Sequence, residues 1–504
     1  MNSKFLNIEN GVKTAIANIP LLPFNEFYEE SLNLLKNGAF VVQYFGYKES
    51  EQIKIVAVLR TDKLWIASAI APKEYPALTC HYPAFNVFER ELAEQYAIKP
   101  IGHPWLKSVR YHANYVADND VFGNDYSKTI PAHYPFFEVK GEEIHQVAVG
   151  PIHAGVIEPG HFRFNCFGEK VLHLEIQLGY QHRGVERQLV KSAFKKLPVI
   201  IESIAGDTAI AQSIAFSEAI EGLADLKVDE DYQKIRAIVL ELERIANHVG
   251  DLGALSGDIA FLPPSAYFGR MRGDFLNLLL KISGNRFGKG LVRPGGTRFA
   301  INSTQKIGFL NELEQLKKEI FHVGDLLFSQ PGVLERFEET GIVDNKTAIE
   351  LGLVGPAARA CELDYDVRRS FPTNFWKTNN YKAIIEASGD VMARASVRYR
   401  EIKKSLKIIE NILNDIDGEK DIKISAEEPR LAPNHLILTL QEAWRGELSH
   451  CIITDSTGKI IRYKIKDPSF HNWNGLAMAM RNGAISDFPL CNKSFNLSYC
   501  GFDL

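Results

Sequence analysis

Short stretches of alternating hydrophobic and polar residues predict β-strands along this chain. Residues 53–59 are largely apolar and are typical of a core strand. Apolar and polar residues then alternate through 162–166 and again through 172–178, on either side of Gly168-Glu169. A glycine-containing turn between two alternating segments predicts a β-hairpin at this place.

A helical period dominates the middle of the chain. Apolar residues recur every three or four positions through 232–250 and through 381–415, which predicts two long helices, each with one buried face. The strand pattern returns later: residues 448–454 and 460–465 flank a Ser-Thr-Gly turn, so we expect a second hairpin there.

These elements indicate an α+β fold in two domains. Residues 1–111 mix strands and helices and are expected to form an N-terminal α/β domain. Residues 112–140 are rich in Asn, Asp, Pro and aromatic residues without sustained periodicity, which predicts a linker. Residues 141–504 then form a mainly helical domain with a β-hairpin near each end.

Composition narrows the function classes. The 504 residues carry a net charge of −4, which gives no electrostatic reason to expect nucleic acid or an anionic membrane as partner. No apolar run reaches the ~18 residues of a membrane span, and the first residues lack the apolar core of a signal peptide. No two of the six cysteines are three residues apart, and no glycine-rich dinucleotide motif follows a strand, so zinc and nicotinamide sites are unsupported.

Several ordered motifs carry a family resemblance. They are Gly150-Pro151-Ile152-His153, Tyr180-Gln181-His182-Arg183-Gly184-Val185-Glu186, Glu241-Leu242-Glu243-Arg244, Arg293-Pro294-Gly295-Gly296, Gly355-Pro356-Ala357-Ala358-Arg359 and Glu442-Ala443-Trp444-Arg445-Gly446-Glu447. In this order they resemble the quinone-site subunit of respiratory complex I. They also resemble the large subunit of membrane-bound, energy-converting nickel–iron hydrogenases of the formate hydrogenlyase type. Residues 141–504 are therefore expected to form a domain like a hydrogenase large subunit.

The N-terminal part resembles a second subunit of the same complexes. Glu89-Arg90-Glu91 and Ile101-Gly102-His103-Pro104-Trp105-Leu106 look like the small hydrophilic subunit that docks beside the quinone-site subunit. The resemblance thus covers nearly the whole chain as a fusion of two subunits. It implies that Glu89, Arg90, Glu91 and His103 build a subunit interface.

The chain departs from hydrogenases at the metal. Ala205, Thr208, Ser498 and Gly501 stand where hydrogenases carry their two pairs of cysteines. A nickel–iron centre needs four thiolate ligands, and neither pair is present. We therefore expect no metal on this chain, with the iron–sulfur cluster in a partner subunit.

The emptied centre is a candidate quinone cavity. Complex I carries Asp and Tyr where this chain has Ala205 and Gly206, so the phenol that helps hold the quinone is missing. His153 matches the histidine that complex I uses as the other contact, and a neutral imidazole can donate one hydrogen bond to a quinone carbonyl. The alternative is that His153 only caps a nearby backbone carbonyl in a tight loop.

The loop that carries Arg183 and Glu186 is the second candidate. By resemblance, Glu186 matches a glutamate that begins the proton path of hydrogenases, and a desolvated carboxyl can relay protons. We take Glu186 and His153 as catalytic candidates and His153, Gly206 and Arg183 as candidate cofactor contacts. The alternative for the loop is an Arg183–Glu186 ion pair with a structural role.

A further set of charged residues favours a structural interpretation. The resemblance places Asp366, Arg368, Glu442 and Arg445 around the buried centre or its coupling path. Buried charges without a metal must pair with one another, so a structural ion network is expected.

The sequence thus predicts an oxidoreductase subunit, peripheral on the cytoplasmic face of the cell membrane. Its expected partners are an iron–sulfur small subunit and integral membrane subunits of complex I-like and antiporter-like type, with quinone or a similar carrier as acceptor and ion translocation coupled to electron transfer. One alternative is a coupling scaffold without catalysis; a weaker one is a hydrogenase with atypical ligands.

Overall fold

The computed structural model describes residues 3–112, 114–115, 120–123, 134–153, 158–417 and 428–504. Its mixture of long helices and small, mostly antiparallel sheets is an α+β fold, as the sequence predicted. The strands are β1 (Leu6–Ile8), β2 (Thr14–Ala15), β3 (Leu21–Leu22), β4 (Phe40–Glu49), β5 (Gln52–Arg60), β6 (Leu64–Ile70), β7 (Glu74–Pro76), β8 (Lys99–Ile101), β9 (Ile144–Val149), β10 (His161–Phe167), β11 (Lys170–Gln177), β12 (Val292–Arg293), β13 (Gly296–Thr297), β14 (His435–Ala443), β15 (Gly446–Thr454) and β16 (Ile460–Lys466).

The helices range from single turns to 29 residues. They are α1 (Phe24–Lys36), α2 (Asn86–Tyr96), α3 (Val185–Lys191), α4 (Leu197–Ile201), α5 (Ala209–Ala224), α6 (Glu230–Asp258), α7 (Leu262–Ser283), α8 (Ser303–Ser329), α9 (Pro331–Phe337), α10 (Asn345–Leu351), α11 (Gly355–Arg359), α12 (Val367–Ser370), α13 (Val391–Asp415), α14 (Ser469–Ala479), α15 (Phe488–Phe495) and α16 (Tyr499–Asp503). Short 3-10 turns lie at Ile16–Asn18, Leu78–Cys80, Pro83–Phe85, Phe194–Lys196, Asn374–Thr378 and Ile485–Asp487.

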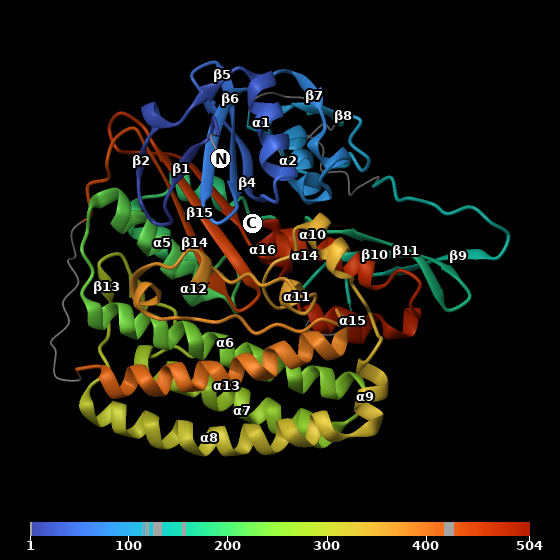
Figure 1. The fold of residues 1–504 in the computed structure, drawn as a ribbon, viewed down its shortest axis with the longest axis vertical. Helices are drawn as coiled ribbons and strands as arrows, with labels where there is room; N and C mark the ends of the chain where they lie inside the picture. Colours follow the sequence, from blue (N-terminus) through green and yellow to red (C-terminus); the bar gives the residue numbers. More distant parts are fainter. Residues whose placement is uncertain (1–2, 113, 116–119, 124–133, 154–157, 418–427) are drawn as a thin grey trace.

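The N-terminal sheet has the order β1-β6-β5-β4, with β3 parallel to β6 on the edge that β1 also uses. The predicted core strand 53–59 lies within β5, whose residues from Val56 to Arg60 are buried. Helices α1 and α2 carry the buried aromatic residues Phe27 and Phe88. This half forms the upper part of the molecule in Figure 1.

Four long helices, α6, α7, α8 and α13, run side by side at the opposite end of the molecule (Figure 1). The predicted helix 232–250 lies inside α6, which begins where Asp229 caps the N–H of Asp231 at 3.0 Å. The predicted helix 381–415 was wrong in its first ten residues. Helix α13 begins only at Val391, because Asp390 accepts the N–H of Ala393 at 2.8 Å and ends the preceding extended segment.

Both predicted hairpins are confirmed. Strands β10 and β11 pair across Gly168-Glu169, and β9 joins them as a third strand. Strands β15 and β16 pair in the same way, and the sheet continues through β14 to β2 in the order β16-β15-β14-β2. Because β2 comes from the N-terminal segment, the two predicted domains share this sheet.

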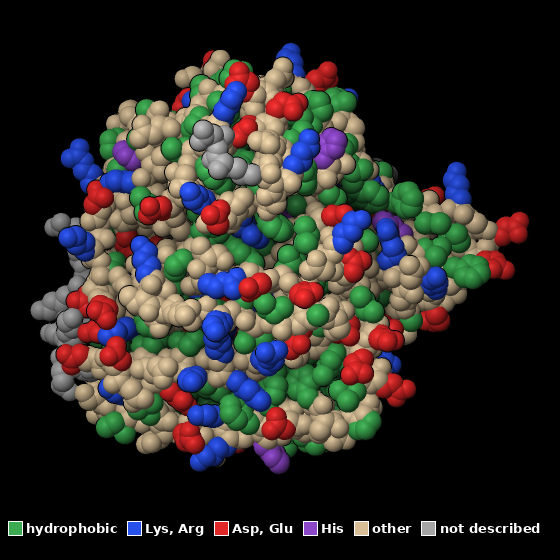
Figure 2. All heavy atoms as spheres, viewed as in Figure 1, with side chains coloured by type: hydrophobic (Ala, Val, Ile, Leu, Met, Phe, Trp, Pro, Cys, Tyr) green, Lys and Arg blue, Asp and Glu red, His purple; other side chains and the backbone are tan. Residues whose placement is uncertain are grey.

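Other predictions are tested only in part. Much of the predicted linker 112–140 falls outside the described residues, and residues 134–140 contain no helix or strand. In the described part of the chain, no helix combines the length and apolar character needed to cross a bilayer. Figure 2 shows Lys and Arg interspersed with Asp and Glu over the visible face, in keeping with the small net charge.

Candidate functional site

Arg445 joins the two segments that stand where hydrogenases carry their cysteine pairs. Its Nη1 and Nη2 donate to the two carboxylate oxygens of Asp207 over 2.8 and 2.7 Å. Its Nε donates to the carbonyl of Asn496 over 2.5 Å, and Nη1 also donates to Thr208 Oγ1 at 3.2 Å. Although burial raises the pKa of Asp207, Arg445 outweighs it and holds that pKa below its ordinary value. A guanidinium cation therefore bridges the emptied centre.

Trp444 fixes the same segment from the neighbouring position. Its indole Nε1 donates to the carbonyl of Asp207 at 3.0 Å and to Thr208 Oγ1 at 3.1 Å. The Arg445 guanidinium lies 3.8 Å from the centre of the Trp444 ring. Thr208 stands at the first ligand pair, and its hydroxyl is committed to these donors rather than directed at an ion.

The second ligand pair is closed by hydrogen bonds. Ser498 caps α16, since its Oγ accepts the N–H of Gly501 at 2.9 Å. A Cβ added to Gly501 would lie 2.7 Å from both Cγ and Oδ2 of Asp467. The carboxyl of Asp467 therefore occupies the space that a cysteine side chain at 501 would need. Burial raises the pKa of Asp467, and its Oδ2 has no hydrogen-bond partner in the described part of the chain.

The residues present do not fit a nickel–iron centre. Cys500 is the one thiol beside these positions; its Sγ lies 3.5 Å from Ser498 Oγ, and burial raises its pKa to about 12. Among the described residues, no three His, Cys, Asp or Glu side chains are grouped closely enough to hold a metal ion. No step of the chemistry is therefore assigned to a metal on this chain.

A network of buried ion pairs connects α6, α11, α13 and β14. The pairs are Arg359–Glu401, Arg359–Glu442, Arg368–Asp366 and Arg368–Glu241, at 2.7 to 2.9 Å. Asp366, Arg368 and Glu442 thus pair with other buried charges, as expected for a centre without a metal. Arg445 stands apart from these pairs and binds Asp207 instead.

Glu186 is ion-paired and buried. Its carboxylate accepts from Arg462 Nη1 at 2.7 Å and from the N–H of Ile465 at 3.0 Å, and Lys464 Nζ lies 3.1 Å away. Burial raises the pKa of Glu186, but Arg462 and Lys464 outweigh it and lower that pKa. The carboxylate is therefore held ionised by cations from β16.

Arg183 does not pair with Glu186, so the alternative of an Arg183–Glu186 ion pair is wrong. Arg183 donates to the carbonyls of Ser203 and Ile204 at 2.5 and 2.9 Å. These carbonyls immediately precede Ala205 and Gly206. Arg183 is thus a positioning residue for the first emptied ligand segment.

Of the four candidate interface residues of the N-terminal part, Glu91 makes a hydrogen bond across the junction of the two halves. Glu91 accepts from Arg110 and, at 2.7 Å, from Lys464 on β16. Lys464 also reaches Glu186, so one cation bridges a carboxylate from each half. Glu89 instead accepts the N–H groups of Leu78 and Thr79 within its own half. Arg90 and His103 bond backbone atoms: Arg90 donates to two carbonyls, and Nδ1 of His103 accepts the N–H of Trp105.

His153 bonds a backbone carbonyl. Its Nε2 lies 3.0 Å from the carbonyl oxygen of Gly160, and its ring lies 6.1 Å from that of Phe162. Glu158, which precedes β10, accepts the N–H groups of Tyr499 and Cys500 at the start of α16. Glu158 therefore connects the start of β10 to the second emptied ligand segment.

Gly206 leaves open space at the surface. A Cβ added here would meet no heavy atom within 4 Å, and the residue is exposed. Ala205 on one side is buried, while Asp207 on the other is bound to Arg445. The position that carries a phenol in complex I is thus exposed and sterically open, next to the Asp207–Arg445 pair, and we call it the open edge.

Sequence reasoning missed Asp467, Arg462 and Lys464. In β16, Arg462, Lys464 and Lys466 alternate with apolar residues, a pattern typical of a solvent-facing strand surface. All three are buried because each meets a carboxylate, and for Arg462 and Lys464 that partner includes Glu186. Only the three-dimensional pairing distinguishes this arrangement from an exposed charged face.

Two family models match the chain. Residues 25–122 match the respiratory-chain NADH dehydrogenase 30 kDa subunit, and residues 258–437 and 420–503 match the 49 kDa subunit. The first match includes α2, whose Glu91 accepts from Lys464 in the second half. The second includes Asp366, Arg445 and the α16 segment.

Curated relatives match either nearly all or about 70% of this chain. Formate hydrogenlyase subunit 5 of Escherichia coli is 26% identical over 477 residues, which cover 92% of this chain and 82% of the relative. NADH-quinone oxidoreductase subunit 4 of Thermus thermophilus is 28% identical over 396 residues, covering 72% and 95%. The membrane-bound hydrogenase subunit alpha of Pyrococcus furiosus is 28% identical over 365 residues, covering 70% and 85%.

Proposed function

This chain joins a 30 kDa-type and a 49 kDa-type subunit domain of respiratory-chain NADH dehydrogenase in one polypeptide, and from that premise we propose its role. It serves as a peripheral subunit of a membrane-associated oxidoreductase complex, on the cytoplasmic face. Electrons arrive from an iron–sulfur partner subunit and pass to a quinone or a similar small carrier. Integral membrane subunits, complex I-like and antiporter-like, couple this transfer to ion movement.

The open edge at Gly206 beside the Asp207–Arg445 pair carries the proposal. A Cβ at Gly206 would meet no heavy atom within 4 Å, and the cation of Arg445 is held beside it by Asp207, which supports an acceptor approaching from this exposed side. A carrier that accepts electrons gains negative charge, which a preorganised cation stabilises. This arrangement supports acceptor chemistry without nickel.

Reduction of a quinone to a quinol takes two electrons, from the partner's cluster, and two protons. One of the two protons can be assigned to a residue of this chain, and the other is taken from solvent water. The Asp467 carboxyl, with its raised pKa and its unpartnered Oδ2, is suited to hold a proton near Arg445. Glu186 remains a relay candidate only if its bonds to Arg462 and Lys464 open during turnover, because they hold it ionised.

Two further residues shape the site in this proposal. Arg183 holds the backbone before Gly206, and His153 provides a ring nitrogen beside Gly160. His153 meets a carbonyl already, so an entering acceptor must exchange with the bond to Gly160.

A coupling scaffold without substrate is the second candidate. The observation that favours it is the ion-paired state of Glu186, together with the Arg359 and Arg368 network. An ion-pair network that can switch between two pairing arrangements can transmit motion without binding a ligand.

The proposal is tested by placing a large side chain at Gly206. Gly206→Phe is expected to abolish acceptor reduction by the assembled complex while assembly stays intact, because a Cβ at this exposed position meets no heavy atom within 4 Å among the described residues. Gly332→Phe is the matched control, since Gly332 is also exposed with no atom within 4 Å of an added Cβ. Unchanged reduction of every tested quinone in the Gly206→Phe complex would favour the scaffold.

A further inference from the structure

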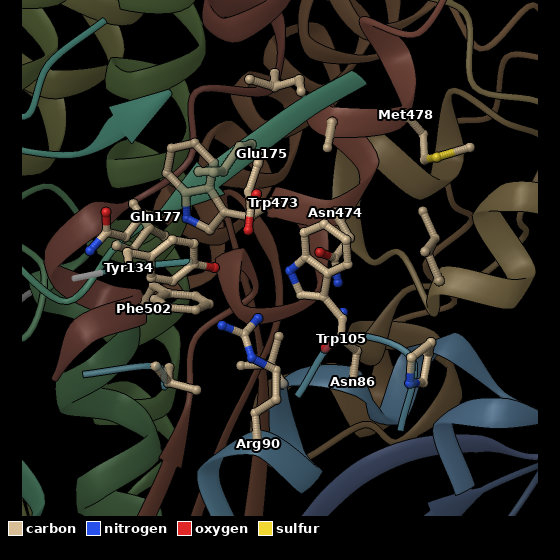
Figure 3. Close-up of a pocket in the computed structure, with 18 of the residues that line it drawn as sticks. Asn86, Arg90, Trp105, Tyr134, Glu175, Gln177, Trp473, Asn474, Met478 and Phe502 are labelled. Atoms are coloured by element: carbon tan, nitrogen blue, oxygen red, sulfur yellow. The ribbon is translucent and has the colours of Figure 1, made fainter. Parts of the chain in front are cut away.

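A cavity of about 270 Å³ lies at the junction of the two halves of the chain. Helix α2 forms one wall, and β11, α14 and the end of α16 form the others (Figure 3). None of the residues at the four emptied ligand positions lines it, and neither does Gly206 or Arg445. The cavity is therefore separate from the candidate acceptor site.

Arg90 brings a positive charge without a counter-charge to this cavity. Its Nε donates to the carbonyl of Lys107 at 2.8 Å and its Nη2 to that of Ser108 at 2.9 Å, which fixes the plane of the guanidinium. Within the described part of the chain, Nη1 makes no hydrogen bond and no carboxylate lies within ion-pair distance of Arg90. In Figure 3 the guanidinium points into the space between Tyr134 and Trp105. A partly buried, unpaired guanidinium favours an anion.

The carboxylate that lines the cavity does not balance Arg90. Glu175 is buried, and its two oxygens accept from Lys107 Nζ and from the N–H of Phe137, both at 2.7 Å. Lys107 thus neutralises Glu175, and the cavity keeps the net positive charge of Arg90.

Aromatic side chains and unpaired polar atoms complete the lining. Trp105, Tyr134, Trp473 and Phe502 give flat apolar surfaces around Arg90 (Figure 3). The Tyr134 side chain is buried, at 7% exposed, and its hydroxyl has no hydrogen-bond partner among the described residues. Buried polar groups of this kind are nearly always bonded in proteins. The cavity therefore provides a hydrogen-bonding group in addition to a cation and ring faces.

We propose that this junction cavity binds a small planar aromatic monoanion, such as a single-ring aromatic carboxylate. The anion pairs with the free Nη1 of Arg90, the ring packs against Trp105 and Tyr134, and a polar substituent satisfies the Tyr134 hydroxyl or Oδ1 of Asn86, which is also unpartnered in the described chain. The cavity is smaller than the ~300–1,000 Å³ of pockets for drug-sized ligands, which fits one ring rather than a fused system. Because α2 belongs to the 30 kDa-type half, the ligand would bind across the fusion junction.

The probe is 4-hydroxybenzoate, added to the full chain purified with its partner subunits. Binding is measured by calorimetry and by quenching of tryptophan fluorescence, since Trp105 and Trp473 line the cavity. We expect saturable binding that weakens about tenfold or more in Arg90→Gln, where a charge-assisted bond is lost. Tyr134→Phe, which removes only the unpartnered hydroxyl, is expected to weaken binding several-fold.

The controls separate this site from surface binding and from misfolding. Arg270→Gln removes the same charge from an exposed position on α7 and is expected to leave binding unchanged. Arg90→Lys keeps the charge, so a folded Arg90→Lys variant with weakened binding identifies the guanidinium even if Arg90→Gln loses stability. Uncharged 4-hydroxybenzyl alcohol is expected to bind much more weakly than 4-hydroxybenzoate.

Three outcomes would overturn the proposal. They are the absence of saturable binding at millimolar 4-hydroxybenzoate, equal binding by folded Tyr134→Phe and Arg90→Lys variants, and equal binding of the uncharged alcohol. Because binding rather than turnover is measured, failure here is distinguishable from failure of the acceptor site at Gly206.

Discussion

Arg445 and Asp207 form a two-point ion pair, with parallel N–H to oxygen bonds of 2.8 and 2.7 Å, in the centre where hydrogenases hold nickel. The pair links the turn between β14 and β15 to the segment before α5. Trp444 donates a further hydrogen bond to the carbonyl of Asp207. A metal ion in such a centre draws its ligand segments together by its charge. In this chain the guanidinium has that structural task.

Arg445→Met tests the pair as a structural element. The change leaves Asp207 without its cation and is expected to lower the free energy of unfolding by about 2 kcal/mol. This is less than the ~3–5 kcal/mol of a fully buried pair, because the Asp207 side chain is 33% exposed. Chemical denaturation of the full chain measures the effect. Arg270→Met, which breaks an exposed pair with Asp274, is the control and should cost under about 1 kcal/mol.

The space at Gly501 gives a second prediction. Gly501→Ala places a Cβ 2.7 Å from Cγ of Asp467 and should destabilise the chain by about 1–3 kcal/mol through overpacking. In an Asp467→Ala background the same change should cost at least ~1 kcal/mol less, since the clashing carboxyl is gone. Additive effects in this double-mutant cycle would show that Asp467 does not fill the lost ligand position. Gly308→Ala, with no neighbour within 4 Å, is the control.

Much of the fold follows from local sequence pattern, and the reason is visible in particular elements. The apolar positions of β10 and β11 alternate along the sequence and are buried, although polar residues such as Asn165 and Glu175 are buried too; the stripe of α6 reflects packing on α7 and α13. The predicted helix was started at 381, although the apolar stripe that supports it begins at Val391, and the boundary depends on the Asp390 cap. Periodicity locates a buried face more reliably than it locates an end.

The site was less predictable, because its bonds join residues far apart in the chain. Arg445 could be placed near the centre by resemblance, but its partner Asp207 lies 238 positions away. Glu186 was paired with Arg183 by proximity in sequence, whereas its cations come from β16. Charged residues on β16 matched an exposed strand face, and only the carboxylates facing them explain why they are buried.

Glu186→Gln distinguishes a structural carboxylate from a relay. The pKa of Glu186 is lowered in the folded chain, so its stabilising contribution is present above its ordinary value of 4.5 and is lost as pH falls below it. The variant should lose about 3 kcal/mol at pH 7 and approach the unmodified chain in acid. Slower proton-coupled turnover with unchanged stability would instead support the relay.

Glu243 is expected to make stability fall as pH rises, the opposite of the effect of Glu186. Burial raises the pKa of Glu243 to about 8. The carboxyl oxygens of Glu243 accept the N–H groups of Ile210 and Ala211 at 2.7 and 3.2 Å, and these bonds lower the pKa by less than burial raises it. Between pH 4.5, the ordinary pKa of a glutamate, and about pH 8, the folded chain therefore binds one more proton than the unfolded chain. Its contribution to stability is complete below that window and falls as pH rises through it. Glu243→Gln should remove this slope from the denaturation midpoint measured at pH 5, 6, 7 and 8; an unchanged slope would contradict the assignment.

His153 separates the acceptor proposal from a purely structural loop. A neutral imidazole has one N–H, and the contact of Nε2 with the carbonyl of Gly160 at 3.0 Å uses it. If an acceptor displaces that bond, His153→Ala should weaken quinone-linked turnover by about 1 kcal/mol, or several-fold, with little effect on assembly. His153→Gln is the sharper variant, because its amide N–H can restore the bond to Gly160 while lacking an imidazole. Full recovery of turnover by His153→Gln would show that capping Gly160 is all that this side chain does. Normal assembly of the His153→Gln complex with turnover still impaired would assign the ring to the acceptor.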